Sequence, residues 1–493
     1  MPHPTLVLYN PRSTSPGKRV LPMSLLALGA LLEGRTEYVI VDGNLEPDPV
    51  ACIAGLVRGG AKTLGVTVMP GPQLSQAVPH SRQLKAMFPN LTVVWGGYFP
   101  TQHWDVVLRA PYVDYVVRGH GEVVFRELLE RLERDEDVRD LQGLAYRDAG
   151  GQPVSNPLAP IPHPQRLPDF PYHRVDVATY VRKCYLGNRT LSHHSSYGCP
   201  FFCNFCAVVT MVNGRWLPQS AERVARIVRW LTQTYRLDAV EFHDNNFFVS
   251  EARTAEFAER IMDLGIAWWG ESRIDTLLKC SQDTWRKMRD SGLKMVFMGA
   301  ESGSDETLKR MDKGGTMSTQ KTLEIARLMK HWGIVPEFSF VMGNPPDPEA
   351  DIRTTIEFIR KVKQVNPASE IVMYMYTPVP LPGDLYDEAR AEGFEFPETL
   401  EEWISPEWNQ FALRRSTQMP WMQRRLRQMA HDFERVLNAY YPTTTDIKLT
   451  GPRRWLLRAV SAWRYHTRFY RFPIELRALH KVMAYQRPET TGF

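Results

Sequence analysis

Two separate stretches of the chain alternate short apolar runs with amphipathic segments, and this alternation constrains the fold more than any other feature. In the first stretch, the apolar runs cover residues 5–9, 37–42, 64–68, 91–95 and 113–117. In the second stretch, they cover residues 190–196, 239–244, 266–273, 294–300, 335–342 and 370–377. Because strands that alternate with helices build parallel sheets, both stretches predict an α/β fold.

The spacing of these elements predicts four regions. Residues 1–133 form a doubly wound, Rossmann-like unit, and residues 134–189 form a hairpin followed by a proline-rich linker. Residues 190–385 hold six βα units, which are too few for an eight-fold barrel and therefore predict a partial (β/α)6 barrel. Residues 386–493 read as a helical region that becomes basic toward its end.

Composition excludes several other classes of protein. The 493 residues are 43% hydrophobic and 23% charged, which is typical of globular proteins and excludes a disordered chain, a collagen or a bare coiled coil. A net charge of +5 is mild for this length and argues against a dedicated nucleic-acid binder. We find no signal-peptide pattern and no apolar stretch long enough to span a bilayer, so we expect a cytoplasmic protein.

Three of the six cysteines fall within eight residues, as Cys199, Cys203 and Cys206, directly after an expected strand. Six cysteines are too few for a disulfide scaffold of this length, and such clustering points to metal. A structural zinc site takes four ligands, commonly as two separated pairs, and the other cysteines form no such pair. Three thiolates would instead leave one iron of a four-iron cluster open to another ligand. A zinc site and a loop of buried cysteines remain the alternatives.

Polar residues and glycines follow successive strands of the second stretch, namely Asp244, Arg273, Glu301 with Ser302, and Gly343. An arginine at such a position pairs with a carboxylate, and a glutamate accepts hydrogen bonds from ammonium or hydroxyl groups. Each also has a structural interpretation: a surface ion pair for Arg273, a loop cap for Asp244, a turn for Gly343 and a partner of Arg273 for Glu301. Phe205, inside the cysteine motif, is either a site residue or plain core.

The spacing CxxxCxxC, with the aromatic Phe205 before the last cysteine, resembles the signature of the radical S-adenosylmethionine (SAM) superfamily. This resemblance implies that Cys199, Cys203 and Cys206 hold a [4Fe–4S] cluster whose open iron is chelated by SAM. It further implies a set of SAM-binding residues, which are Phe205, Asp244, Arg273, Glu301, Ser302 and Gly343.

Residues 5–133 resemble the cobalamin-binding domains of one large radical SAM class, through the stretches 65–73, 94–101 and 118–122. The resemblance implies corrin contacts at Met69 and Gly71. It implies contacts to the nucleotide tail at Gly96, Gly97, Tyr98, Gly119 and Glu122. The loop at residues 10–19 contains neither Asp nor His, so this loop would supply no lower axial histidine.

The two resemblances together imply a cobalamin-dependent radical SAM C-methyltransferase. A 5′-deoxyadenosyl radical would remove a hydrogen from an unactivated carbon, and methylcobalamin would supply the methyl group. The alternatives are a radical SAM oxidoreductase or cyclase without methyl transfer, of the tetrapyrrole type, and a non-catalytic cobalamin or redox sensor.

We expect a small-molecule substrate, which would be apolar if the protein touches a membrane, and an electron donor such as flavodoxin or ferredoxin. We expect no nucleic-acid partner. The basic amphipathic segment after residue 448 either contacts an anionic membrane surface or packs on the barrel.

Overall fold

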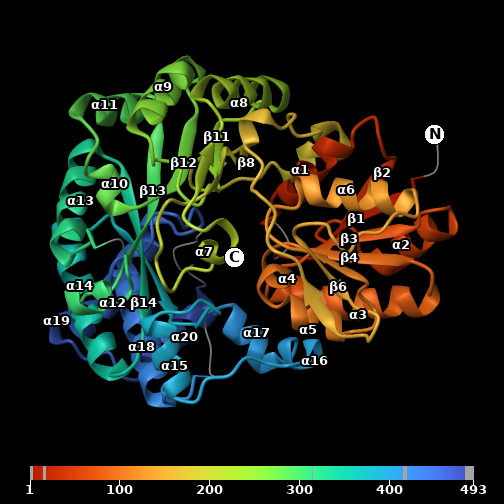
Figure 1. The fold of residues 1–493 in the computed structure, drawn as a ribbon. Coiled ribbons are helices and arrows are strands. Elements are labelled where there is room, and N and C mark those ends of the chain that lie inside the picture. The colour runs from red at the N-terminus through yellow and green to blue at the C-terminus, as the bar shows by residue number, and fades with distance from the viewer. Residues whose placement is uncertain (1–3, 15–17, 314, 415–418, 484–493) are drawn as a thin grey trace.

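The computed structural model describes residues 4–14, 18–313, 315–414 and 419–483. Two parallel-sheet units lie side by side, and the C-terminal helices run beneath both of them (Figure 1). The N-terminal unit is red to orange in Figure 1, and the barrel is mainly yellow to green.

The N-terminal unit is a parallel sheet covered by helices on both faces. Its parallel strands lie in the order β2-β1-β3-β4-β5, so the order reverses beside β1. These strands are β1 (Leu6–Asn10), β2 (Tyr38–Asp42), β3 (Thr63–Thr67), β4 (Thr92–Gly96) and β5 (Tyr115–Val117). The helices are α1 (Met23–Leu32), α2 (Pro49–Arg58), α3 (Pro72–Met87), α4 (Tyr98–Gln102), α5 (Trp104–Arg109) and α6 (Glu122–Glu133). The predicted doubly wound architecture is confirmed, and its ligands are expected at the carboxyl ends of the strands.

The expected hairpin belongs to this sheet and not to the linker. Strands β6 (Leu144–Arg147) and β7 (Pro153–Ser155) are antiparallel to each other, and β6 pairs with β5. Gly151 makes the turn with a φ of 77°. The first unit therefore extends to Ser155, beyond the expected boundary at residue 133. The proline-rich linker follows, with three short 3-10 helices at Pro164–Arg166, Tyr172–Arg174 and Val177–Tyr180.

The second unit is a parallel six-stranded sheet in the order β15-β14-β13-β12-β11-β8, which confirms the predicted partial barrel. Its strands are β8 (Thr190–His193), β11 (Ala239–Phe242), β12 (Ala267–Ser272), β13 (Leu293–Glu301), β14 (Val335–Met342) and β15 (Glu370–Met375). A separate two-stranded sheet joins β9 (Ser196–Gly198) to β10 (Trp216–Pro218). The helices of this unit are α7 (Val208–Val212), α8 (Ala221–Tyr235), α9 (Glu251–Ile261), a 3-10 turn (Met262–Leu264), α10 (Ile274–Leu277), α11 (Gln282–Asp290), α12 (Asp305–Arg310), α13 (Thr319–Trp332) and α14 (Pro348–Val365).

The C-terminal region is helical, as predicted, over its described residues; residues 484–493 lie outside them. Its helices are α15 (Asp384–Ala391), α16 (Leu400–Trp403), α17 (Pro406–Ala412), α18 (Arg424–Tyr440), α19 (Gly451–Thr467) and α20 (Ile474–Val482). Trp403 of α16 meets Phe99 of α4 edge-on, with ring centroids 5.0 Å apart, while α18 packs on α14 of the barrel. The C-terminal region therefore joins the two sheet units. None of the described helices combines the length and the apolar character needed to cross a bilayer.

Candidate active site

The loop that carries the three cysteines lies between β9 and α7, at the mouth of the barrel. Gly198 ends β9 with a φ of 80°, and a Cβ at this position would lie 2.3 Å from the Arg215 carbonyl oxygen, so glycine is required. The Asn204 side-chain amide donates to the Arg310 carbonyl at 2.6 Å, which ties the loop to the barrel. Active sites of βα barrels lie at this carboxyl-terminal face.

The three loop cysteines are free thiols; Cys203 is buried, and Cys199 and Cys206 are half-buried. Burial raises the pKa of all three, to about 12 for Cys206, and the Cys203 thiol adds to the rise at the other two. The described residues contain no group of three or more His, Cys, Asp or Glu side chains arranged around a single metal ion. Thiols with a raised pKa lose their protons when a metal cation binds them. The three neighbouring cysteines therefore fit an iron–sulfur cluster, because its ligands are thiolates.

Arg273 reaches the cysteine loop from the carboxyl end of β12. Its Nη1 donates to the Cys203 sulfur at 3.2 Å, and its Nε donates to Asp275 at 3.0 Å. The guanidinium carbon lies 3.7 Å from the centre of the Phe201 ring. Arg273 is therefore buried in the predicted site, and its ion-pair partner is Asp275 and not Glu301.

Glu301 ends β13, and the structure pairs it with Lys313, a residue that no sequence motif indicated. The Lys313 ammonium forms an ion pair with the Glu301 carboxylate and also donates to the Gly299 carbonyl at 2.6 Å. Glu301 has a φ of 62°, a left-handed conformation that is uncommon outside glycine. Such strained backbone clusters at functional sites, which favours the predicted role of Glu301.

Asp244 lies fully buried behind the cysteine loop, and its carboxylate already has three partners. It accepts from the Ser195 backbone at 2.7 Å and from the Ser195 and Ser196 hydroxyls, each at 2.6 Å. Ser195 also accepts from Arg253 at 2.7 Å. The loop-cap interpretation of Asp244 therefore describes these contacts, and the SAM contact stays a prediction.

Three further predicted SAM residues lie at the same end of the barrel with different degrees of access. Gly343 has a φ of 80°, and the Met422 methyl group occupies the space where its Cβ would lie, so the turn interpretation accounts for this glycine. Ser302 is fully buried and accepts from the Ser304 backbone at 3.1 Å. Phe205 is half-buried, with the Lys313 ammonium 6.0 Å from its ring centre.

A cavity of about 430 Å³ lies between the N-terminal sheet and the barrel. Six of the seven predicted cobalamin residues line it: Met69, Gly96, Gly97, Tyr98, Gly119 and Glu122. Gly71 was predicted with them but does not line the cavity. Its missing Cβ faces Ala412 of α17 at 3.4 Å, because the turn after β3 points toward the C-terminal region.

The walls of this cavity fit the nucleotide tail of cobalamin. Most of its lining is apolar, and its glycines include Gly65 and Gly97. A Cβ at Gly97 would lie 3.1 Å from the Val68 carbonyl oxygen, and one at Gly65 would lie 3.0 Å from the Phe125 ring. Glycines thus keep open a slot of the kind that takes a flat apolar group.

The barrel supplies the opposite wall of the cavity. His194, Tyr197, Val208 and Met211 line it, and the last two lie on α7, directly after Cys206. Within this wall, Tyr197 stacks on His120 of the N-terminal unit with ring centroids 4.4 Å apart. Helix α7, which follows the cysteine loop, is therefore also a wall of the cavity, and we call it the shared wall.

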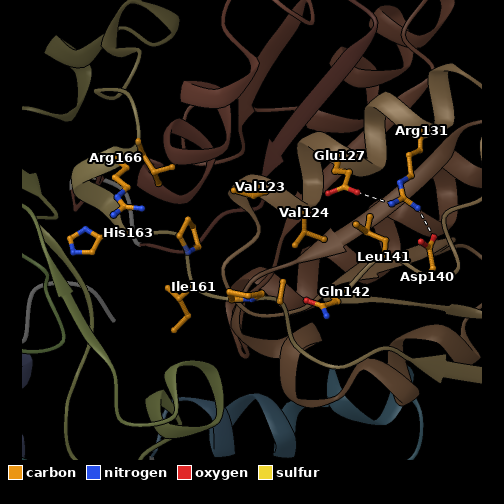
Figure 2. Close-up of a pocket in the computed structure, with 14 residues that line it drawn as sticks. Val123, Val124, Glu127, Arg131, Asp140, Leu141, Gln142, Ile161, His163 and Arg166 are labelled. Atoms are coloured by element: carbon orange, nitrogen blue, oxygen red, sulfur yellow. Dashed lines mark hydrogen bonds and ion pairs between the residues drawn. The ribbon is translucent and has the colours of Figure 1, made fainter.

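A second cavity, of about 680 Å³, lies apart from these residues, between α6 and the proline-rich linker (Figure 2). None of the predicted site residues lines it. Its polar wall holds the ion pair of Arg131 with Glu127 at 2.7 Å, and Asp140 lies on the other side of the same guanidinium.

Comparison with known proteins assigns both domains. Residues 194–359 match the model of the radical SAM superfamily, and residues 12–129 match that of the B12 binding domain. An uncharacterized methyltransferase of Pyrococcus horikoshii is 27% identical over 366 residues, which are 72% of this chain and 78% of that protein. The anaerobic magnesium-protoporphyrin IX monomethyl ester cyclase of Synechocystis sp. is 27% identical over 340 residues, which are 68% of this chain and 66% of the cyclase.

The structure of the radical SAM methyltransferase TsrM from Kitasatospora setae, with tryptophan and a SAM analogue bound, has the same fold. The TM-score is 0.63 at 16% identity, over 82% of each chain. The chain therefore combines a radical SAM domain with a B12-binding domain. The radical SAM domain implies a [4Fe–4S] cluster and SAM, and the B12-binding domain implies cobalamin.

Proposed function

We propose that this chain is a cobalamin-dependent radical SAM C-methyltransferase that acts on an unactivated carbon of a small molecule. The observation that carries the proposal is the shared wall: α7 follows Cys206 and lines the cobalamin cavity through Val208 and Met211. A substrate at this wall would lie between the two cofactor sites. The methyltransferase relative from Pyrococcus horikoshii supports the same reaction class.

Three groups of residues would bind the three cofactors. Cys199, Cys203 and Cys206 would hold the cluster, and Phe205, Asp244, Arg273, Glu301, Ser302 and Gly343 are the proposed SAM residues. Cobalamin would lie along Met69, Gly96, Gly97, Tyr98, Gly119 and Glu122. When bound, these groups supply a 5′-deoxyadenosyl radical that removes a hydrogen atom and a methyl group that replaces it.

The side chains around the proposed site would exclude water from it. Phe99 and Trp403 close the interface between the N-terminal unit and α16. Gln102 of α4 donates to the Thr210 hydroxyl of α7 at 3.0 Å, which fixes the N-terminal unit to the cysteine loop. A closed site protects reactive intermediates from solvent.

Product analysis tests the methyltransferase proposal. The chain is reconstituted anaerobically with iron, sulfide and cobalamin, and then receives SAM, a strong reductant and extracts of small molecules. We expect 5′-deoxyadenosine, S-adenosylhomocysteine that depends on cobalamin, and a product that has gained one CH₂. Deoxyadenosine without cobalamin-dependent S-adenosylhomocysteine would contradict methyl transfer and favour the second candidate, a radical cyclase or oxidoreductase, which the cyclase relative supports.

We also propose two partners. Reduction of the cluster needs an external donor, and a flavodoxin or ferredoxin is the proposed one. The second partner is an anionic membrane surface, at the turn between α19 and α20. Here the buried Arg464 donates to the carbonyls of Phe469 and Phe472 at 3.2 and 3.1 Å. The side chains around it are exposed, at 49% for Trp463, 50% for Phe469, 64% for Phe472 and 68% for Ile474.

Vesicle sedimentation tests the membrane contact. Arg471, next to Phe472, is exposed. Exposed aromatic side chains beside an exposed arginine bind anionic lipid interfaces, so we expect the chain to sediment with phosphatidylglycerol vesicles and less with phosphatidylcholine vesicles. High salt and the double variant Trp463→Ser/Phe472→Ser should reduce this binding. The matched control is Trp230→Ser, because Trp230 is 44% exposed on α8. Equal sedimentation with both lipids, or an unaffected double variant, would argue against the contact.

A further inference from the structure

Arg414 lies at the mouth of the barrel, although it comes from the C-terminal region. The backbone amide of Met375, the last residue of β15, donates to the Arg414 carbonyl at 3.1 Å. The Arg414 guanidinium carbon lies 5.2 Å from the centre of the Tyr374 ring. The carboxyl end of the last barrel strand therefore holds both the backbone and the side chain of Arg414 in place.

The backbone of Arg414 is strained. Its φ of 53° is left-handed, and residues other than glycine adopt this conformation at an energetic cost. The Arg414 amide donates to the Phe411 carbonyl at 2.8 Å, in the turn that ends α17. A left-handed residue is common just after a helix, and this one places the Arg414 carbonyl on the backbone amide of Met375.

Arg414 lies near the N-terminal unit and the cysteine loop as well as β15. Ala412, two residues before Arg414, lies 3.4 Å from the position of a Cβ at Gly71 of the N-terminal unit. A Cβ at Gly383, which follows β15, would lie 3.1 Å from the Asn204 side chain of the cysteine loop. Burial raises the pKa of Tyr98, in the cobalamin cavity, to about 12, and the Arg414 charge opposes this rise. Arg414 is thus placed to act on a group held between these three segments.

Arg414 differs from the other cations of this region in its pairing. Arg273 pairs with Asp275 and Lys313 pairs with Glu301, and both cations are buried. Arg414 is exposed, and no carboxylate of the described residues forms an ion pair with it. Its guanidinium is therefore available to an anion from outside the chain.

We infer that Arg414 binds an anionic group of the substrate, a carboxylate or a phosphate. The inference rests on the proposed function, because it takes the barrel mouth as the substrate site. A guanidinium presents two parallel N–H donors to a carboxylate or phosphate, and this geometry orients a ligand as well as binding it. The substrate class is accordingly a small molecule with one acidic end, held so that its reacting carbon lies toward the cysteine loop.

Calorimetric titration with three ring compounds tests the inference: benzoate, phenyl phosphate and the neutral benzamide, each added to the cofactor-loaded chain. We expect both anions, or one of them, to bind at least roughly tenfold more tightly than benzamide, as a charge-assisted hydrogen bond provides. Arg414→Gln should remove this preference, and Arg414→Lys should keep part of it. The stronger anion identifies the acidic group as carboxylate or phosphate.

The matched control is Arg236→Gln. Arg236 is also an exposed arginine with a left-handed backbone, at a φ of 52°, but it ends α8. We expect its variant to bind the anions as the wild type does. Equal binding of benzamide, no binding of either anion, or an unchanged Arg414→Gln variant would overturn the inference. The titration involves no turnover, so its result is independent of whether a methylated product forms.

Discussion

The Cys203→Ala variant is expected to form no 5′-deoxyadenosine above the level of a reaction without enzyme. Cys203 is the buried member of the cysteine loop and accepts a hydrogen bond from Arg273 at 3.2 Å. Alanine supplies no thiolate, so one iron of the cluster would lose its protein ligand. Iron and sulfide content after anaerobic reconstitution, together with deoxyadenosine released from SAM, measures the effect.

Cys280→Ala is the control for this prediction. Cys280 is a half-buried free thiol that follows α10, and its sulfur donates a weak hydrogen bond to the Thr276 carbonyl at 3.9 Å. We expect its variant to keep wild-type iron content and deoxyadenosine formation. Melting curves of both variants establish that each is folded. Wild-type amounts of deoxyadenosine from a folded Cys203→Ala variant would refute the assignment of the cluster to this loop.

The parallel strands were predictable because each buried parallel strand is a short continuous apolar run. β1 and β4 are examples: all five residues of β1 and the three central residues of β4 are buried. Glycines at strand ends similarly indicated the cobalamin cavity, where Gly96, Gly97 and Gly119 lie together. The local sequence pattern is sufficient to predict where these residues lie, because each strand places its last residue at the edge of the sheet.

Contacts between distant segments were not predictable in this way. Lys313 pairs with Glu301 because the chain returns to the end of β13 after α12, and no local pattern encodes this return. Gly71 follows a strand end as the other glycines do, yet it faces Ala412. Arg414 comes from a region without a recognisable motif, and only the docking of the C-terminal region on β15 places it at the barrel mouth.

Hydrogen bonding accounts for the loop-cap interpretation of Asp244. Its position after β11 is the position of a ligand-binding residue. Ser195, between β8 and β9, and Ser196, the first residue of β9, donate to both of its carboxylate oxygens. The serines lie three and four residues before Cys199. Asp244 thereby holds the start of the cysteine loop, and its effect on the cluster would pass through backbone position.

Asp244→Ala is therefore expected to reduce the free energy of unfolding by about 3–5 kcal/mol, the usual effect of removing one member of a buried charged network. The change leaves the Ser195 amide and both serine hydroxyls without their acceptor. It also removes a negative charge near the buried Arg253, which donates to Ser195 at 2.7 Å. Urea denaturation of the chain before reconstitution measures the loss without interference from the cofactors.

Asp263→Ala is the matched control, because Asp263 is 64% exposed and pairs with Arg229 on the surface at 2.7 Å. Surface pairs contribute about 0–1 kcal/mol, so this variant should unfold almost as the wild type does. Asp244→Asn separates the two roles of Asp244, since the amide keeps one acceptor oxygen for the serines. If Asp244 acts through the loop, Asp244→Asn should be more stable than Asp244→Ala and should bind SAM nearly as the wild type does. A stable Asp244→Asn variant that has lost SAM binding would instead establish the direct contact that the sequence predicts.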